Sequence, residues 1–340
     1  MKNKGAICIG IAIAVIILFF CNLFYGTISI PAAAVMDILL GRVPEKGVWT
    51  TIVLQSRIPQ AVTALLSGSA LAVSGLMLQT LFRNPLAGPS ILGISNGASL
   101  GVAVIMLYSG GVLGAAAGFS NHIIIVLGAF IGASAVLVLI LYFAAKVKSP
   151  VLVLILGIMV GYVASSGISV LNAYASADNI RSYVMWGMGS FSGVQSAQLS
   201  FYAGLICLGL FFSILLIKPL NVLLLGDNYA TNLGANVMQV RIFILLITGF
   251  LTAVVTAFCG PVTFIGLAVP HVARMVLGTS NQKLLLPATI LSGAALALLC
   301  NMMTIIPFGK GLLPLNAVTP ALGAPIVIYV ILNNKSGNQS

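Results

Sequence analysis

The sequence predicts an all-α integral membrane protein with about ten transmembrane helices. Hydrophobic residues make up 60% of the chain and charged residues only 6%, whereas a soluble domain carries roughly a quarter charged residues. The apolar runs are long and continuous, without the two-residue alternation of barrel strands. Because backbone polar groups in lipid must be satisfied within the protein, these runs are predicted to be helices.

The apolar runs predict a single transmembrane domain that fills residues 1–340. The predicted spans are 6–25, 58–81, 91–108, 123–143, 151–172, 199–217, 242–259, 262–276, 285–305 and 316–333. The third and eighth are short, and Pro270 is expected to break the eighth. The first is interpreted as a membrane helix and not a cleaved signal, because no small-residue cleavage site follows it. The apolar segment 31–40 is predicted to form a short surface helix.

The distribution of basic residues predicts how the spans are oriented in the membrane. With the N-terminus inside, the cytoplasmic ends carry Lys2, Lys4, Arg83, Lys146, Lys148, Lys218, Arg241, Arg274, Lys283 and Lys335, and the outer side carries Arg42, Lys46, Arg57, Arg181 and Lys310. This excess follows the positive-inside rule and places both termini in the cytoplasm, with the chain in the cytoplasmic (inner) membrane. The basic residues are scattered singly, so nucleic acid is not expected as a partner.

Several motifs are absent from the sequence, and their absence argues against particular classes of function. The five cysteines have no metal-binding or disulfide spacing and are interpreted as buried thiols. The chain has no phosphate-binding GxxxxGK[ST] loop, and no span carries an ionisable residue clearly at its middle. His271 has no second ligand nearby in sequence and is interpreted as a structural hydrogen-bonder. We therefore expect no enzymatic activity, no metal and no bound cofactor, and if the chain pumps a substrate, its energy comes from a partner protein.

Glycine placement predicts where segments approach or turn. Three pairs have GxxxG spacing, which permits close helix contact in lipid: Gly97/Gly101, Gly128/Gly132 and Gly157/Gly161. In the cytoplasmic loop 221–241, Gly226 and Gly234 divide apolar positions of helical spacing, which predicts two short helices. Such helices could enter a groove on a soluble partner; the alternative is an interfacial element that only caps the bundle. At 260–274, Gly260 and Pro261 predict a broken helix, which at membrane depth needs protein or a cavity beside it.

Four stretches resemble one known family. Residues 57–101 (RIPQAVTALLSGSALAVSGLMLQTLFRNPLAGPSILGISNGASLG), 225–241 (LGDNYATNLGANVMQVR), 260–278 (GPVTFIGLAVPHVARMVLG) and 318–332 (VTPALGAPIVIYVIL) are similar, in this order, to FecCD-type permeases. That family imports ferric siderophores, haem and cobalamin. The resemblance implies the type II ABC importer permease fold, in which two copies form a homodimer around a central pathway. It also implies two ATP-binding subunits on the cytoplasmic side and a substrate-binding protein on the outer side.

The resemblance also assigns roles to positions. It implies ATPase coupling for Asp227, Ala230, Leu233 and Gly234, with Asp227 where Glu is more usual. It implies a cytoplasmic gate at Asn84, Leu86, Lys148 and Ser149. It implies pathway-lining positions at Gly157, Gly161, Ser165 and Ser166, for which tight helix packing is the alternative.

Receptor docking is where the chain departs from the family pattern. Arg57 fits the first position of an RxPR motif, and Lys310 is the nearest substitute for a further basic residue. Gln60 replaces the second arginine, Asn301 stands where an acid is often found, and LLPLN (312–316) replaces ELPxG. The number of docking ion pairs therefore stays open.

The resulting hypothesis is a permease subunit of an ATP-driven importer for an iron chelate, either a ferric siderophore or haem. Cobalamin is the alternative substrate. An ion-coupled secondary carrier and a membrane scaffold or sensor are the other classes. The missing intramembrane charges argue against the carrier, and the lack of a soluble output domain argues against the scaffold or sensor.

Overall fold

A computed structural model describes residues 4–42, 44–108, 121–147, 149–305 and 313–336. In these ranges every regular element is helical. The α-helices are α1 (Lys4–Phe24), α2 (Ala32–Leu39), α3 (Gly47–Ile52), α4 (Ile58–Phe82), α5 (Ile94–Ala103), α7 (Asn121–Lys146), α8 (Pro150–Tyr174), α9 (Ala177–Gly187), α10 (Ser196–Leu215), α11 (Ile217–Leu223), α12 (Asp227–Asn232), α13 (Val237–Cys259), α14 (Ile265–Leu277), α15 (Gln282–Thr304) and α16 (Leu315–Ser336). Shorter helical turns are η1 (Val53–Arg57), η2 (Pro89–Leu92), η3 (Val104–Tyr108) and η4 (Phe191–Gly193).

The long helices coincide with predicted spans. Among the described residues, seven helices are long and apolar enough to cross a membrane, and three shorter apolar helices lie at Ile94–Tyr108, Ile265–Leu277 and Leu315–Tyr329. These ten positions match the ten predicted spans, and the third and eighth are short, as predicted. The all-helical class is confirmed, whereas a count of ten complete crossings stays a prediction. The short helix predicted at 31–40 is α2.

The second span is much longer than predicted, because helix begins at Gly47 and continues to Phe82. A π-helical turn, η1, joins α3 to α4 immediately before Pro59. Proline cannot donate a backbone hydrogen bond and its ring crowds the preceding turn, so a widened turn lets the helix continue. Polar residues interrupt the apolar run at Thr50, Thr51 and 55–57, so a search for apolar runs missed this extension.

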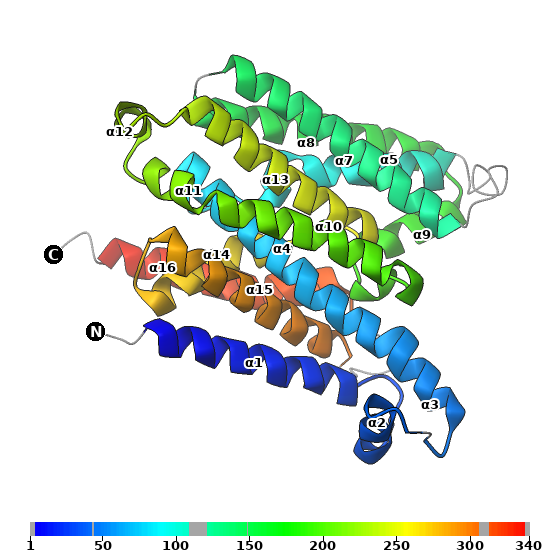
Figure 1. The fold of residues 1–340 in the computed structure, drawn as a ribbon. Helices are drawn as coiled ribbons and strands as arrows, with labels where there is room; N and C mark the ends of the chain where they lie inside the picture. The colour runs from blue at the N-terminus through cyan, green and yellow to red at the C-terminus, as the bar shows by residue number, and fades with distance from the viewer. Residues whose placement is uncertain (1–3, 43, 109–120, 148, 306–312, 337–340) are drawn as a thin grey trace.

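Helix α4 forms the centre of the bundle, where it contacts α10, α13, α14 and α15 (Figure 1). Glycines allow the closest approaches. A Cβ atom built on Gly101 would lie 2.0 Å from the Gly128 carbonyl oxygen, and one on Gly132 would lie 2.1 Å from the Gly97 oxygen. Two of the three predicted GxxxG pairs, Gly97/Gly101 and Gly128/Gly132, therefore join α5 to α7, where small residues permit van der Waals contact between backbones.

The predicted break at 260–274 is confirmed at its first position and wrong at its second. Helix α13 ends at Cys259, Gly260 has a φ of +73°, and α14 begins at Ile265. Helix α14 then continues through Pro270 without interruption. Pro270 leaves the Gly266 carbonyl without its usual helical donor. A Cβ atom on Gly75 would lie 1.6 Å from that oxygen, so the freed carbonyl packs directly against Gly75 of α4.

The two ends of the bundle differ in what they display (Figure 1). Helices α11 and α12 lie at one end, together with the beginning of α1 and the end of α16. Helices α2, α3 and α9 lie at the opposite end. Both terminal helices thus start or finish on the side of the 221–241 loop, which agrees with the predicted topology.

Candidate functional site

The loop predicted to couple to an ATPase contains two short helices. Helix α11 begins at Ile217, before the predicted segment, and Gly226 separates it from α12 with a φ of +108°. Gly234, at φ +82°, ends α12: its amide donates to the Thr231 carbonyl (2.9 Å) and the next amide donates to the Ala230 carbonyl (3.0 Å). This is the Schellman arrangement, in which a left-handed residue, usually glycine, satisfies the last carbonyls of a helix.

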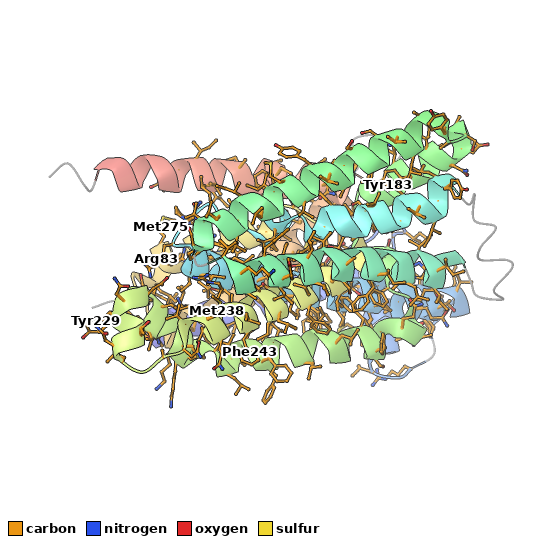
Figure 2. All side chains as sticks on the ribbon, turned by 90° about the horizontal axis from the view of Figure 1, so that it is seen from above. Arg83, Tyr183, Tyr229, Met238, Phe243 and Met275 are labelled. Carbon is orange, nitrogen blue, oxygen red and sulfur yellow. The ribbon has the colours of Figure 1, made fainter. Side chains whose placement is uncertain are left out.

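Helix α12 has one buried face and one exposed face. Ala230 is fully buried, whereas Tyr229 in the helix, and Leu225 and Leu233 on either side of it, are each more than half exposed. Figure 2 shows the Tyr229 side chain directed away from the bundle at the same end as Arg83. Exposed apolar side chains at helical spacing are typical of an element that enters a groove on a partner. Of the predicted coupling residues, Leu233 therefore lies on the exposed face and Ala230 anchors the helix.

Asp227, the first residue of α12, contacts two arginines from other elements. Its carboxylate forms a salt bridge with Arg83, which follows the last turn of α4. Its second oxygen lies 3.9 Å from Nη2 of Arg241, a side chain only 4% exposed near the beginning of α13. The negative carboxylate is also stabilised by the positive N-terminal end of the dipole of its own helix. Sequence reasoning assigned neither arginine a role beyond topology, because a charge at a span end carries no information about its partner.

The NPLA turn, predicted as part of the gate, begins at that salt bridge. Arg83 ends α4 in the left-handed conformation, with φ +45°. The Asn84 Oδ1 atom accepts from the Leu86 amide (2.9 Å), which closes an Asx turn, and Leu86 is 43% exposed. His271 Nε2 lies 2.6 Å from the Pro85 carbonyl oxygen. The structural role predicted for His271 is therefore confirmed, because this contact fastens the turn to α14.

The second predicted gate segment precedes α8. Lys148 lies outside the described residues. Ser149 is the N-cap residue of α8, and its side chain makes no capping hydrogen bond. Arg241 Nη1 donates to the carbonyl of Val147 (3.1 Å). Arg241 thus connects Asp227 to the residue two positions before Ser149, so the structure brings the coupling helix together with both predicted gate segments.

The predicted pathway residues divide into two groups along α8. Gly157 and Gly161 are buried against η2 and the first turn of α5. A Cβ atom on Gly161 would lie 2.9 Å from the Asn96 side chain. Asn96 Nδ2 also donates to the Gly161 carbonyl (3.1 Å). Tight packing therefore accounts for these two glycines. Ser165 and Ser166 are exposed, and a pathway role for the four residues stays a prediction.

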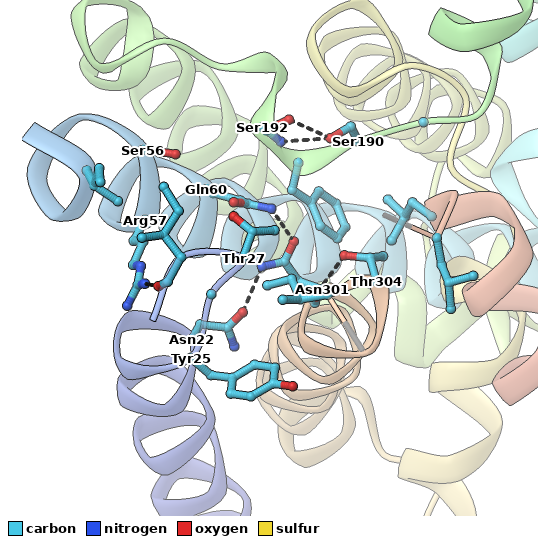
Figure 3. Close-up of a pocket in the computed structure, with 18 residues that line it drawn as sticks. Asn22, Tyr25, Thr27, Ser56, Arg57, Gln60, Ser190, Ser192, Asn301 and Thr304 are labelled. Carbon is cyan, nitrogen blue, oxygen red and sulfur yellow. Dashed lines mark hydrogen bonds between the residues drawn. The ribbon is translucent and has the colours of Figure 1, made fainter. Parts of the chain in front are cut away.

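At the opposite end of the bundle, Arg57 lies in a pocket between α1, α4 and α15 (Figure 3). The arginine is only 6% exposed. Its Nη1 atom donates to the carbonyls of Leu23 (2.7 Å) and Phe24 (3.0 Å), and its Nη2 atom donates to Ile28. In this conformation the guanidinium holds the chain that leaves α1. Receptor docking by Arg57 stays a prediction, and Lys310 lies outside the described residues.

Two of the departures from the family pattern touch each other in the same pocket. Gln60 Nε2 donates to Asn301 Oδ1 (2.9 Å), and Asn301 Nδ2 donates to Asn22 Oδ1 (2.7 Å) (Figure 3). Asn22 in turn donates to the Leu298 carbonyl (3.1 Å). A neutral amide chain therefore occupies positions where the resemblance implies an arginine and an acid, and the two departures are in direct hydrogen-bond contact.

Sequence reasoning missed the importance of Asn316, the last residue of the LLPLN stretch. Its Nδ2 atom donates to the carbonyls of Gly187 (3.0 Å) and Pro261 (2.5 Å), and its Oδ1 atom accepts from the Thr263 amide (3.3 Å). Asn316 thereby joins the end of α9, the 260–264 break and the beginning of α16. A departure from a family motif next to a broken helix was the available signal.

The described residues offer little to a metal ion. Within them, no three histidine, cysteine, aspartate or glutamate side chains come together. Two cysteines, Cys259 and Cys300, are buried as predicted, but Cys207 is exposed on α10. Since α10 is one of the apolar spans, its exposed face is available to lipid and a small apolar thiol is suited to it.

Comparison with known proteins identifies the family. The model of the FecCD transport family matches residues 14–333. The chain belongs to the FecCD transport family. Its relatives include vitamin B12 import system permease proteins BtuC. The protein from Citrobacter koseri is 34% identical over 284 residues, which cover 83% of each chain. The protein from Klebsiella pneumoniae is 35% identical over 282 residues, which cover 83% of this chain and 82% of the relative.

A solved structure extends the match of this FecCD-family chain to the whole fold. An inward-facing conformation of a metal-chelate type ABC transporter superposes with a TM-score of 0.84 at 26% identity, covering 97% of this chain and 99% of that one. The FecCD assignment, the apolar helices and this likeness together make the chain a multi-pass membrane permease. The resemblance drawn from the four sequence stretches is confirmed.

Proposed function

We propose that this chain is the membrane-spanning permease subunit of an ATP-driven importer, and that it carries a corrinoid such as vitamin B12. The relatives named vitamin B12 import permeases, at 34–35% identity over 83% of the chain, are the observation that supports this substrate. The corrinoid therefore takes precedence over the ferric siderophore or haem expected first from the sequence. The metal-chelate type transporter of similar fold agrees with this substrate class.

The arrangement of partners follows from the chemistry of the chain. No phosphate-binding loop occurs in the sequence, so ATP and Mg²⁺ belong to two separate ATP-binding subunits. These subunits dock on the exposed apolar residues of α12, while a substrate-binding protein docks at the opposite end, where the Arg57 pocket opens. Two copies of the permease enclose the pathway in the inner membrane, with both termini in the cytoplasm.

Transport proceeds by alternating access. Closure of the ATP-binding subunits displaces α12, and α12 contacts the segments before α8 and after α4 through Arg241 and Arg83. A rigid element with two arrangements can carry a displacement in this way. The four coupling residues Asp227, Ala230, Leu233 and Gly234 and the four gate residues Asn84, Leu86, Lys148 and Ser149 take these roles in the proposal.

The test is uptake into lipid vesicles that contain this chain with its ATP-binding subunit and binding protein. Cyanocobalamin, a ferric hydroxamate siderophore and haem are supplied in parallel, with and without ATP. We expect ATP-dependent uptake of cyanocobalamin alone. Uptake of an iron chelate alone would instead support a ferric siderophore or haem as the substrate. ATP-independent uptake driven by an ion gradient would replace the importer with a secondary carrier.

A further inference from the structure

Asp227 is the one acidic residue at its end of the bundle. The sequence holds only four acids. Asp37 lies in α2 and Asp178 in α9, both at the opposite end (Figure 1), and Glu45 lies between α2 and α3. Ten basic residues are predicted for the Asp227 side, so several cations are available to this single carboxylate. It contacts two of them, and both are linked to predicted gate segments.

The two arginines differ in their surroundings. Arg83 is half exposed and Asp227 is 41% exposed, so water screens this pair. The Arg241 side chain is only 4% exposed and holds the Val147 carbonyl as well as approaching Asp227. A buried guanidinium with fixed partners is a rigid attachment point. The carboxylate therefore connects the rigidly held Arg241, which binds the segment before α8, with the more exposed Arg83, which follows α4.

The backbone around α12 gives these contacts a mechanical consequence. Gly226 and Gly234 flank the helix, and each has a positive φ that other residues adopt poorly. A Cβ built on Gly234 would meet nothing within 4 Å, so space is not what demands glycine there. With a glycine at either side, α12 depends on side-chain contacts to hold it in one orientation relative to the gate segments.

We propose that Asp227 is a positioning residue that ties α12 to both gate segments, through Arg83 after α4 and through Arg241 to Val147 before α8. This inference rests on the proposed importer function, and it assigns Asp227 a task distinct from touching the ATPase. The exposed apolar residues receive the partner, and the carboxylate passes their displacement inward. Removing the charge frees α12 from the gate segments, so the helix opens locally more often and is no longer held in line with the gate.

A matched pair of variants separates this tie from the helix-dipole effect. Asp227→Asn removes the carboxylate and preserves the size of the side chain. The double variant Asp227→Asn/Asn228→Asp restores a negative charge to the first turn of α12, but successive residues on a helix do not share a face. Asn228 is exposed. Asp227→Glu keeps the charge within reach of the arginines, and Asp178→Asn is the control for loss of an acid at the other end.

The first measurement is hydrogen exchange of residues 227–235 in the purified chain in lipid nanodiscs, which needs neither substrate nor partners. We expect exchange about fivefold faster in Asp227→Asn, the size of effect for a largely exposed ion pair. The double variant should exchange equally fast, and Asp227→Glu and Asp178→Asn should match the wild type. Recovery in the double variant would overturn the tie, because the helix dipole alone would then explain Asp227.

The second measurement is the ratio of cyanocobalamin imported to ATP hydrolysed in vesicles that contain the complete complex. We expect this ratio to fall at least about fivefold in Asp227→Asn and in the double variant, and to recover in Asp227→Glu. An unchanged ratio together with faster exchange would overturn the transmitting role. If the wild type imports no cyanocobalamin, the proposed substrate fails, whereas the exchange result still decides whether the tie exists.

Discussion

Replacing Gly75 with alanine should destabilise the protein by driving α4 and α14 apart. The added Cβ atom would lie 1.6 Å from the Gly266 carbonyl oxygen, whereas carbon and oxygen pack no closer than about 3.3 Å. The neighbour is backbone, so no side-chain rotation can relieve the overlap. Gly266 is itself confined, since a Cβ there would lie 2.7 Å from the Leu71 carbonyl and from the ring of Pro89.

The size of the loss follows from this geometry. A gap of 0.5–1 Å already forfeits a quarter to a half of the dispersion energy between two surfaces, and overpacking in a dense core typically costs 1–3 kcal/mol. Because helix backbones must move here, we expect a loss of about 3 kcal/mol. With an unfolding entropy of about 2.1 cal/mol/K per residue, this lowers the melting temperature of the 340-residue chain by about 4 °C. Gly10→Ala is the matched control: Gly10 is exposed on α1 and nothing lies within 4 Å of its Cβ position.

The assay is thermal unfolding of the purified chain in one lipid or detergent condition, with both variants measured beside the wild type. Gly10→Ala should keep or raise the melting temperature, since alanine favours helix over glycine by about 1 kcal/mol. A Gly75→Ala protein as stable as the wild type would refute the inference that the carbonyl freed by Pro270 packs against Gly75.

Three further predictions concern coupling and the two ends of the bundle. Gly234→Trp should insert normally but uncouple ATP hydrolysis from uptake, because the left-handed backbone at position 234 strains an L side chain by about 1–2 kcal/mol. Gly234→Asn is the control and should transport, since asparagine tolerates this conformation. Wild-type uptake by the Trp variant would argue against the coupling assignment. Asn301→Asp should lower the free energy of unfolding by about 3 kcal/mol, because it buries an unpaired charge. Adding Gln60→Arg should restore at least half of this loss in thermal unfolding. Additive losses from the two substitutions would show that the two positions are independent. His271→Ala should cost about 1 kcal/mol and speed hydrogen exchange at the turn that contains Pro85, and unchanged exchange would show that this contact does not hold the turn.

Much of the candidate site could be predicted one segment at a time. The glycines of the 221–241 loop predicted two short helices, because positive φ favours glycine and ends a helix. The resemblance supplied the coupling and gate positions, but no pattern in the chain predicted that Asp227 contacts Arg83 and Arg241, which lie 144 and 14 positions away. Side-chain pairing between distant segments depends on how helices pack, and a single sequence does not encode it locally.

The sequence by itself determined that this protein is an integral membrane protein and that it is helical. Composition and run length suffice for both conclusions, because lipid forces every backbone group into internal hydrogen bonds. The tertiary structure decided that α14 continues through Pro270, that Gln60 and Asn301 form a hydrogen bond, and that Arg57 binds the carbonyls at the end of α1. Each of these depends on a contact between segments far apart in the chain, where the free energy of a proline, an amide or a charge is set by its neighbours in space.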